Sequence, residues 1–315
     1  MGIISNNTNR ISIFTNDVET TSIVNNTLSD KTGSQVLTEG MPRLLDLYEK
    51  YGIKTTFFFT GYIAEKFPEV VRMIIPYGHE VASHGYTHRI EKSFDLLSLS
   101  EQIEHLKKSK AILENISGQE VISFRAPAAR VNKNTAIALL ETGFKVDSSV
   151  ASQRFDFFLS FGNKAKLNWL VAPRKPYFTD KNNLWTKGEG KILEIPISAM
   201  ILPYIGTTLR ISPFLTKSMR YLLKFESEFT SKPIVFLTHP NEFIDEEKNS
   251  EHKIRRARNI ISYFLGDLVR HSLKQRNLGI KALPLLDKEI QYFTESNYRF
   301  ITCKEFYLEK LNTKI

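Results

Sequence analysis

The chain has 315 residues, of which 42% are hydrophobic and 24% charged, and its formal net charge is +9. This composition excludes an intrinsically disordered chain and is sufficient for one large α/β domain or two smaller ones. The single cysteine, Cys303, excludes an internal disulfide. No run approaches the roughly eighteen uninterrupted apolar residues of a transmembrane helix.

The basic residues are spread along the sequence, except for a cluster at 253–258. We interpret this cluster as the solvated face of a helix. We expect no nucleic-acid partner, because basic and aromatic residues are not interleaved as they are in nucleic-acid-binding strands. The first seven residues lack the basic and apolar segments of a secretion signal. We therefore expect a cytoplasmic protein, with peripheral association with a membrane left open; its oligomeric state does not follow from the sequence.

Short β-rich segments alternate with longer helical patterns in the first half of the chain. The run at 54–59 is a continuous stretch of β-branched and aromatic residues, typical of a strand that is buried on both faces. Gly52, Gly118 and Gly143 each follow a helical pattern and end it. The strands predicted here are 11–14, 54–59, 79–83, 121–124 and 144–146, and the helices are 42–51, 63–77, 98–116 and 133–142.

The alternation is interrupted at about 151–190, where aromatic residues, prolines and charges follow no clear period. We interpret this stretch as an irregular insertion near the functional site, within a single domain that spans residues 1–315. The strands predicted beyond it are 192–197, 233–237 and 298–301, and the helices are 213–225, 251–274, 284–294 and 303–311. Eight strands separated by helices predict an α/β fold with a parallel sheet closed or nearly closed into a barrel.

Chemically active side chains follow the predicted strands at the points where the strands end. In chain order they are Asp17, Glu19, His84, His88, Arg125, Asp147 and His239. Because the carboxyl ends of parallel strands form one face of a barrel, we expect these side chains to share one pocket. His84 and His88 are close enough in the chain for their ring nitrogens to converge on one divalent cation. The set indicates hydrolysis at a metal, with further groups for proton transfer and an arginine to orient one of them.

These residues belong to five motifs that follow one another along the chain. The motifs are Ile13-Phe14-Thr15-Asn16-Asp17-Val18-Glu19, Thr55-Thr56-Phe57-Phe58-Phe59-Thr60-Gly61, Gly78-His79-Glu80 through His84-Gly85-Tyr86-Thr87-His88, Phe124-Arg125-Ala126-Pro127 and Leu237-Thr238-His239. In this order they resemble the motifs of the polysaccharide deacetylases with a NodB-homology domain, from about residue 11 to residue 302. The run at 194–204 resembles a branch whose first motif reads Asp-Val-Glu. The resemblance implies a distorted (β/α) barrel of seven to eight parallel strands, a divalent metal, most often zinc, and hydrolysis of an N-acetyl or O-acetyl group on a sugar.

The first motif departs from the family pattern of two adjacent aspartates, a base followed by a metal ligand. If Thr15 is aligned with the threonine of the motif, Asp17 is the base and Glu19 is the available ligand. If Asn16 and Asp17 are aligned with the aspartate pair, Asp17 is the ligand and an amide, which cannot accept a proton, stands in place of the base. We favour the first alignment, in which Asn16 points to the opposite face of the strand. The fourth motif also departs, because no tryptophan follows Asp147.

The resemblance implies a role for each site residue. Glu19, His84 and His88 hold the metal. Asp17 takes a proton from the attacking water, and Arg125 fixes its position. His239, oriented by Asp147, protonates the departing sugar nitrogen. The backbone N–H of Ala128 helps to stabilise the oxyanion.

We therefore predict a metal-dependent enzyme that acts on carbon–nitrogen bonds other than peptide bonds. Its substrate is an acetylated carbohydrate, either a poly- or oligosaccharide or a glycan precursor. Two alternatives remain open: an allantoinase-like hydrolase of a small amide, and a carbohydrate-binding relative that has lost its base. The sugar and the acyl group are determined by loops, and the motifs do not specify them.

Overall fold

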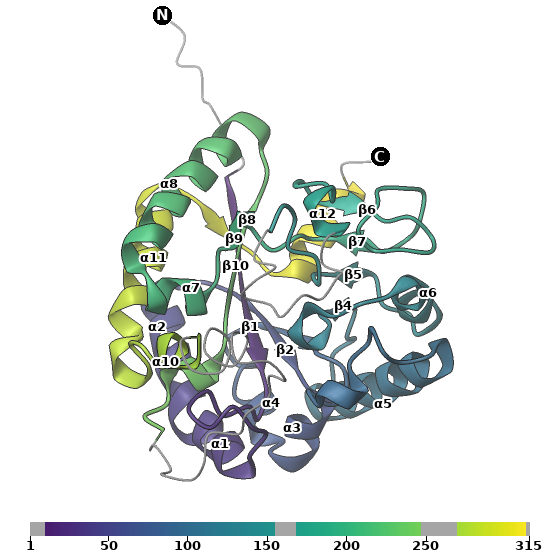
Figure 1. Ribbon diagram of the computed structural model, residues 1–315, viewed down its shortest axis with the longest axis horizontal. Coiled ribbons are helices and arrows are strands. Elements are labelled where there is room, and N and C mark those ends of the chain that lie inside the picture. Colours follow the sequence, from purple (N-terminus) through teal and green to yellow (C-terminus); the bar gives the residue numbers. More distant parts are fainter. Residues whose placement is uncertain (1–9, 155–167, 247–269, 313–315) are drawn as a thin grey trace, which may run out of the picture.

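The computed structural model describes residues 10–154, 168–246 and 270–312 (Figure 1). Nine strands form one sheet in the order β10-β1-β2-β3-β4-β5-β7-β6, and β11 also pairs with β1. The strands are β1 (Ile11–Val18), β2 (Thr56–Phe59), β3 (Glu80–Ser83), β4 (Ser123–Phe124), β5 (Val146–Asp147), β6 (Tyr177–Phe178), β7 (Leu193–Glu194), β10 (Ile234–Thr238) and β11 (Arg299–Phe300). All the pairings are parallel except that of the edge strand β6 with β7.

The helices lie around the sheet (Figure 1). They are α1 (Asp30–Gln35), α2 (Met41–Lys50), α3 (Gly61–Lys66), α4 (Glu69–Arg72), α5 (Leu99–Ser117), α6 (Lys133–Glu141), α7 (Gly206–Ile211), α8 (Pro213–Thr230), α10 (Arg270–Lys274), α11 (Leu283–Glu295) and α12 (Cys303–Asn312). A short antiparallel pair, β8 (Ala199–Met200) and β9 (Leu202–Pro203), lies apart from the main sheet. None of the helices in the described part of the chain combines the length and apolar character needed to cross a lipid bilayer.

The segment that follows β7 joins the two ends of the parallel sheet. The backbone N–H of Ser198 donates to the oxygen of Val235 in β10 at 3.1 Å. The N–H of Val235 donates in turn to Ser198 Oγ at 3.0 Å. Because these bonds link the β7 side of the sheet to β10 without a regular strand, the barrel is closed but distorted. The predicted fold, a distorted barrel of seven to eight parallel strands, is confirmed.

The alternation of side chains along β1 separates two apolar cores. Ile11 and Ile13 point into the barrel and pack with inward residues of the other strands. Phe14 and Val18 point outward and pack with the surrounding helices. Asp17 follows Ile11 and Ile13 in the inward register, so its carboxylate lies inside the barrel near the end of β1.

Helix α12 closes the amino-terminal end of the barrel. Its residues Cys303 and Phe306 pack with the inward-facing side chains. The first turn of α12 is held by the strands, because Thr56 Oγ1 accepts from the N–H of Cys303 at 2.9 Å. Glu80 Oε2 accepts from the N–H of Lys304 at 3.0 Å. This arrangement leaves the carboxyl ends of the strands as the end of the barrel at which a site can form.

Each of the eight predicted strands is present, but several helices differ from the prediction. Residues 206–211, for which no helix was predicted, form α7, and the helix predicted at 213–225 continues to Thr230 as α8. The helix predicted at 63–77 is divided into α3 and α4, and Pro68 stands at the start of the second. Residues 30–40, for which no element was predicted, form α1 and a π-helical turn, η1 (Val36–Gly40). The helix predicted at 251–274 lies mostly outside the described residues, which include only its end as α10. The single-domain assignment stays a prediction.

Candidate active site

Asp17 is held inside the barrel by Arg125. The guanidinium of Arg125 donates to Asp17 Oδ1 at 2.8 Å, and both side chains are almost fully buried. The remaining N–H groups of Arg125 donate to Thr15 Oγ1 and to the backbone and side-chain oxygens of Ser148, all at 2.8 Å. Burial would raise the pKa of Asp17, but Arg125 and two nearby imidazoles hold it below its ordinary value. Asp17 is therefore an oriented carboxylate that is ionised at neutral pH.

Glu19, His84 and His88 form a second group next to Asp17. One ligand atom from each lies within 4.8 Å of the others. Glu19 Oε2 lies 3.1 Å from His88 Nε2. Glu19 Oε2 is buried and has no hydrogen-bond donor of suitable geometry. Two imidazoles and a buried carboxylate make a donor set that is typical of zinc sites.

The orientation of His84 is fixed from behind by the backbone. Its Nδ1 lies 2.8 Å from the carbonyl oxygen of Arg125, to which an Nδ1–H can donate. This assigns the proton to Nδ1 and leaves Nε2 unprotonated, 3.8 Å from Asp17 Oδ2. Burial lowers the pKa of His84 to about 4, so the imidazole is neutral at neutral pH. A neutral imidazole with a backbone acceptor behind it is the usual state of a metal-binding histidine.

Asn16 lies on the other side of the β1 strand. Its Oδ1 accepts from the hydroxyl of Tyr48 in α2 at 2.6 Å. Its amide donates to Thr55 Oγ1 at 3.2 Å. Asn16 is therefore bonded between the sheet and α2, outside the barrel. Asp17 lies beside Arg125 and Glu19 beside the histidine pair, as the favoured alignment of the first motif expects. The roles of base and ligand stay a prediction.

The prediction that Asp147 orients His239 is wrong, because the carboxylate beside His239 belongs to Glu242. His239 Nδ1 lies 3.6 Å from Glu242 Oε1. On the other side of the ring, Nε2 lies 4.0 Å from Asp17 Oδ2. Burial would lower the pKa of His239, but Glu242 holds it above the ordinary value. Burial would likewise raise the pKa of Glu242, but Arg210 and His239 hold it well below the ordinary value.

The side chain of Asp147 lies outside the pocket because of its register in β5. Val146 points into the barrel, so the next residue, Asp147, points out of it. Its carboxyl accepts from Ser149 Oγ at 2.7 Å and adjoins Glu194, its partner in β7. Burial raises the pKa of Asp147. It also raises the pKa of Glu194 well above the ordinary value, and the neighbouring Asp147 adds to this shift. The two carboxyl groups form a buried pair outside the barrel.

Ala128 lies in the loop that directly follows Arg125. It is exposed and has a left-handed backbone conformation, with φ +51°, as has Ala129 with φ +52°. Left-handed non-glycine residues are costly and concentrate at functional sites. Its role in stabilising an oxyanion stays a prediction.

Residues 23–146 match the family model of the polysaccharide deacetylases. This segment contains His84, His88 and Arg125. Over this segment the chain is similar to the polysaccharide deacetylases. Asp17, Glu19 and His239 lie outside the match. They are linked to the matched segment by their contacts in the structure, since Asp17 pairs with Arg125 and Glu19 with His88.

Curated relatives match over a similar part of the chain. A peptidoglycan deacetylase from Helicobacter pylori is 35% identical over 116 residues, which are 37% of this chain and 39% of the relative. A peptidoglycan-N-acetylglucosamine deacetylase from Bacillus cereus is 29% identical over 108 residues, 34% of this chain and 38% of the relative. This chain thus spans well under half the length of these two relatives.

Solved structures resemble the whole fold at low identity. A Mycobacterium smegmatis protein assigned to the polysaccharide deacetylases has a TM-score of 0.56 at 19% identity, covering 96% of each chain. The PuuE allantoinase has a TM-score of 0.59 at 15% identity, covering 96% of this chain and 90% of its own. Because the fold is shared by proteins with different activities, these likenesses support the barrel fold but do not indicate the substrate. The substrate has to be inferred from the residues of the site.

Glu242 is the site residue that the sequence analysis missed. It lies in the short 3₁₀ turn Pro240–Phe243 that follows β10, three residues after His239. Its Oε1 accepts from Thr207 Oγ1 at 2.8 Å and its Oε2 from Thr238 Oγ1 at 2.8 Å. Arg210 donates to Oε1 at 3.2 Å. The sequence signal was a carboxylate one helical turn after a histidine, a spacing that brings two side chains together.

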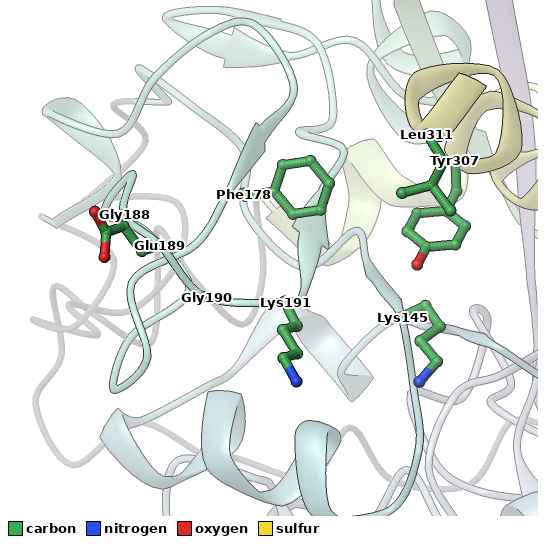
Figure 2. Close-up of a pocket in the computed structure, with 8 residues that line it drawn as sticks. All are labelled: Lys145, Phe178, Gly188, Glu189, Gly190, Lys191, Tyr307 and Leu311. Atoms are coloured by element: carbon green, nitrogen blue, oxygen red, sulfur yellow. The ribbon is translucent and has the colours of Figure 1, made fainter. Parts of the chain in front are cut away.

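A hollow of about 480 Å³ lies at the other end of the barrel (Figure 2). It includes Lys145 and Lys191, which stand just before β5 and β7, and Tyr307 and Leu311 of α12. None of the predicted site residues lines it. The hollow is therefore separate from the site at the carboxyl ends of the strands.

Proposed function

We propose that the protein is a metal-dependent deacetylase that hydrolyses an acetylated amino sugar in a glycan. The observation that carries this proposal is the placement of Glu19, His84 and His88 beside the Asp17–Arg125 pair, within one barrel. The names of the curated relatives, which are peptidoglycan deacetylases, support a polymer of N-acetylated sugars as the first substrate class.

The residues present fit a divalent cation. Glu19 Oε2 is buried beside two imidazoles without a hydrogen-bond donor of its own. His84 Nε2 is available because Nδ1 is occupied by the Arg125 carbonyl. Two nitrogens and one carboxylate oxygen favour zinc over calcium or magnesium, which prefer oxygen ligands. When bound, the metal would polarise the acetyl carbonyl and lower the pKa of a water molecule.

Asp17 is the base in this proposal. Its Oδ1 is committed to Arg125, so Oδ2, which faces His84 and His239, is the atom that accepts the proton of the attacking water. Arg125 keeps the carboxylate ionised and fixes its direction. The position of Asn16 outside the barrel argues against a relative that has lost its base, because the carboxylate inside is present.

His239 is the acid that protonates the leaving nitrogen. Glu242 lies on its Nδ1 side and raises the pKa of the imidazole, which favours the form protonated on both nitrogens. Nε2 therefore carries the proton toward the pocket. Glu242 takes here the positioning role that we had predicted for Asp147.

The test is release of acetate by zinc-loaded protein from a panel of substrates. The panel contains N-acetylated chito-oligosaccharides, peptidoglycan, O-acetylated xylan and allantoin, with Glu19→Ala as the metal-site control. We expect acetate from the N-acetylated substrates and none from Glu19→Ala. Opening of allantoin without release of acetate would instead support the small-amide alternative, and a metal-loaded protein that turns over nothing would support a binding protein.

A further inference from the structure

Helix α8 (Pro213–Thr230) carries large apolar side chains on both of its faces. Met219 and Leu223 are buried in the main core, as expected for a helix that covers a barrel. Leu222 is nevertheless 53% exposed, and three phenylalanines and a tyrosine are also strongly exposed. Together these five residues form what we call the outer face of α8: Phe214, Tyr221, Leu222, Phe225 and Phe229.

The outer face is a continuous stripe. Phe214, Tyr221, Phe225 and Phe229 follow one another at spacings of seven, four and four residues, which brings them to one side of a helix. The rings of Phe225 and Phe229 are 4.5 Å apart. Figure 1 shows α8 along the outer edge of the molecule. Tyr221 contacts the edge of Tyr292 in α11. The two ends of the stripe are open, since Phe214 is 82% and Phe229 75% exposed.

The charges on and around α8 are predominantly basic. Among the described residues, six cations lie on the helix or pair with it, against three carboxylates; two of the cations, Arg220 and Lys232, are buried. The cations are Arg10, Arg174, Lys217, Arg220, Lys224 and Lys232, and the carboxylates are Glu226, Glu228 and Glu289. Lys217 is exposed on the same side as the apolar stripe. The net charge of the whole chain has the same sign, at +9.

We propose that the outer face of α8 docks on a lipid bilayer that contains anionic lipids. A helix that lies in a membrane interface combines an apolar stripe of Phe and Leu with flanking lysines. The rings and Leu222 enter the boundary between headgroups and acyl chains, and Lys217 and Lys224 extend toward the headgroup phosphates. The barrel would then be held at a surface by a contact that does not involve its active site.

A second copy of the chain is the other partner that could bind to this apolar stripe. The charge balance favours the bilayer, because two copies that each carry a positive charge around α8 repel one another, whereas an anionic surface attracts them. The proposal is independent of the substrate, since none of the active-site residues lies on α8.

Flotation of the 315-residue chain with lipid vesicles tests the proposal. Vesicles of equal parts phosphatidylglycerol and phosphatidylcholine are compared with phosphatidylcholine alone. The double variant Phe225→Glu/Phe229→Glu should reduce the vesicle-bound fraction at least about tenfold, because two exposed rings that would enter the bilayer are replaced by charges. The matched control is Leu96→Glu, which changes a side chain that is 61% exposed on the loop before α5 and should bind as the wild type does.

Three results would overturn the proposal. They are wild-type protein that does not float with anionic vesicles, a double variant that floats as well as the wild type, and equal binding to both kinds of vesicle. Sedimentation equilibrium without lipid identifies the alternative. A wild-type dimer that becomes a monomer in the double variant would assign the outer face to a second copy of the chain. Thermal unfolding verifies that the variants are folded.

Discussion

His239 and Glu242 lie side by side, with Nδ1 of the imidazole 3.6 Å from Oε1 of the carboxylate. Glu242 is itself held by Thr207, Thr238 and Arg210, so it is a fixed point against which the imidazole is placed. The opposite nitrogen of His239 faces Asp17. The proposed acid and base therefore face the same space from β10 and β1.

Replacing Glu242 with Gln should weaken the acid without removing it. The amide keeps the size of the side chain but loses the charge that raises the pKa of His239. We expect kcat on N-acetylated sugars to fall by about ten- to a hundredfold, with KM little changed, because the loss lies in protonation of the leaving group. Activated aryl esters, which need no such proton, should lose much less.

The control for that experiment is Asp147→Asn. Asp147 points out of the barrel and adjoins Glu194, so its replacement should leave the leaving-group dependence of turnover as it is in the wild type. If Asp147→Asn abolishes amide turnover while Glu242→Gln preserves it, the assignment of Glu242 is incorrect.

Arg125→Ala should strongly destabilise the protein. The substitution leaves Asp17 buried without its cation and removes hydrogen bonds to Thr15 and Ser148. We expect the free energy of unfolding to fall by about 3–5 kcal/mol. Denaturant titration measures this loss. Combining Arg125→Ala with Asp17→Asn should restore part of it, since the uncompensated charge is then gone; strictly additive losses would show that the two side chains are not coupled.

The buried pair of Asp147 and Glu194 predicts a pH-dependent stability. The pKa of Glu194 in the folded protein lies well above its ordinary value of 4.5, chiefly because of burial. A raised pKa means that the folded state holds the proton more tightly than the unfolded state. This contribution to stability is complete below pH 4.5 and is lost as the pH rises toward the folded value.

Glu194→Gln tests this linkage, because the amide imitates the protonated acid at every pH. Its Oε1 can still accept from the N–H of Val150, as Glu194 does at 3.1 Å. The variant should unfold at a higher temperature than the wild type at pH 8 and show a smaller difference at pH 4. A constant difference across this range would mean that Glu194 does not titrate as described.

Much of the fold was predictable from the sequence. The run at 54–59 and the glycines that end helices are local signals, and the strands they delimit became β2, β4 and β5. The register of β1 was also predictable, because period-two alternation places Asp17 inside the barrel and Asn16 outside it. The helix predicted at 63–77 was wrong in its continuity, because Pro68 was treated as a residue within the helix.

The partner of His239 was less accessible to prediction. The expectation for Asp147 came from the order of family motifs, whereas its direction depends on the two-residue period of β5. Glu242 could have been found from its spacing, three residues after His239, but the contacts by which Arg210 and Thr207 of α7 hold it could not. These are long-range contacts, which local sequence patterns do not encode.

The most direct test of the central claim is the metal content of Asp17→Asn, measured together with its release of acetate. Asp17 as the base predicts that the variant retains the metal at the wild-type level and loses activity by at least about a hundredfold, while Glu19→Ala loses the metal. Asn16→Asp should have no benefit, because its side chain faces Tyr48 outside the barrel. Loss of metal from Asp17→Asn, together with a gain of activity in Asn16→Asp, would contradict the account.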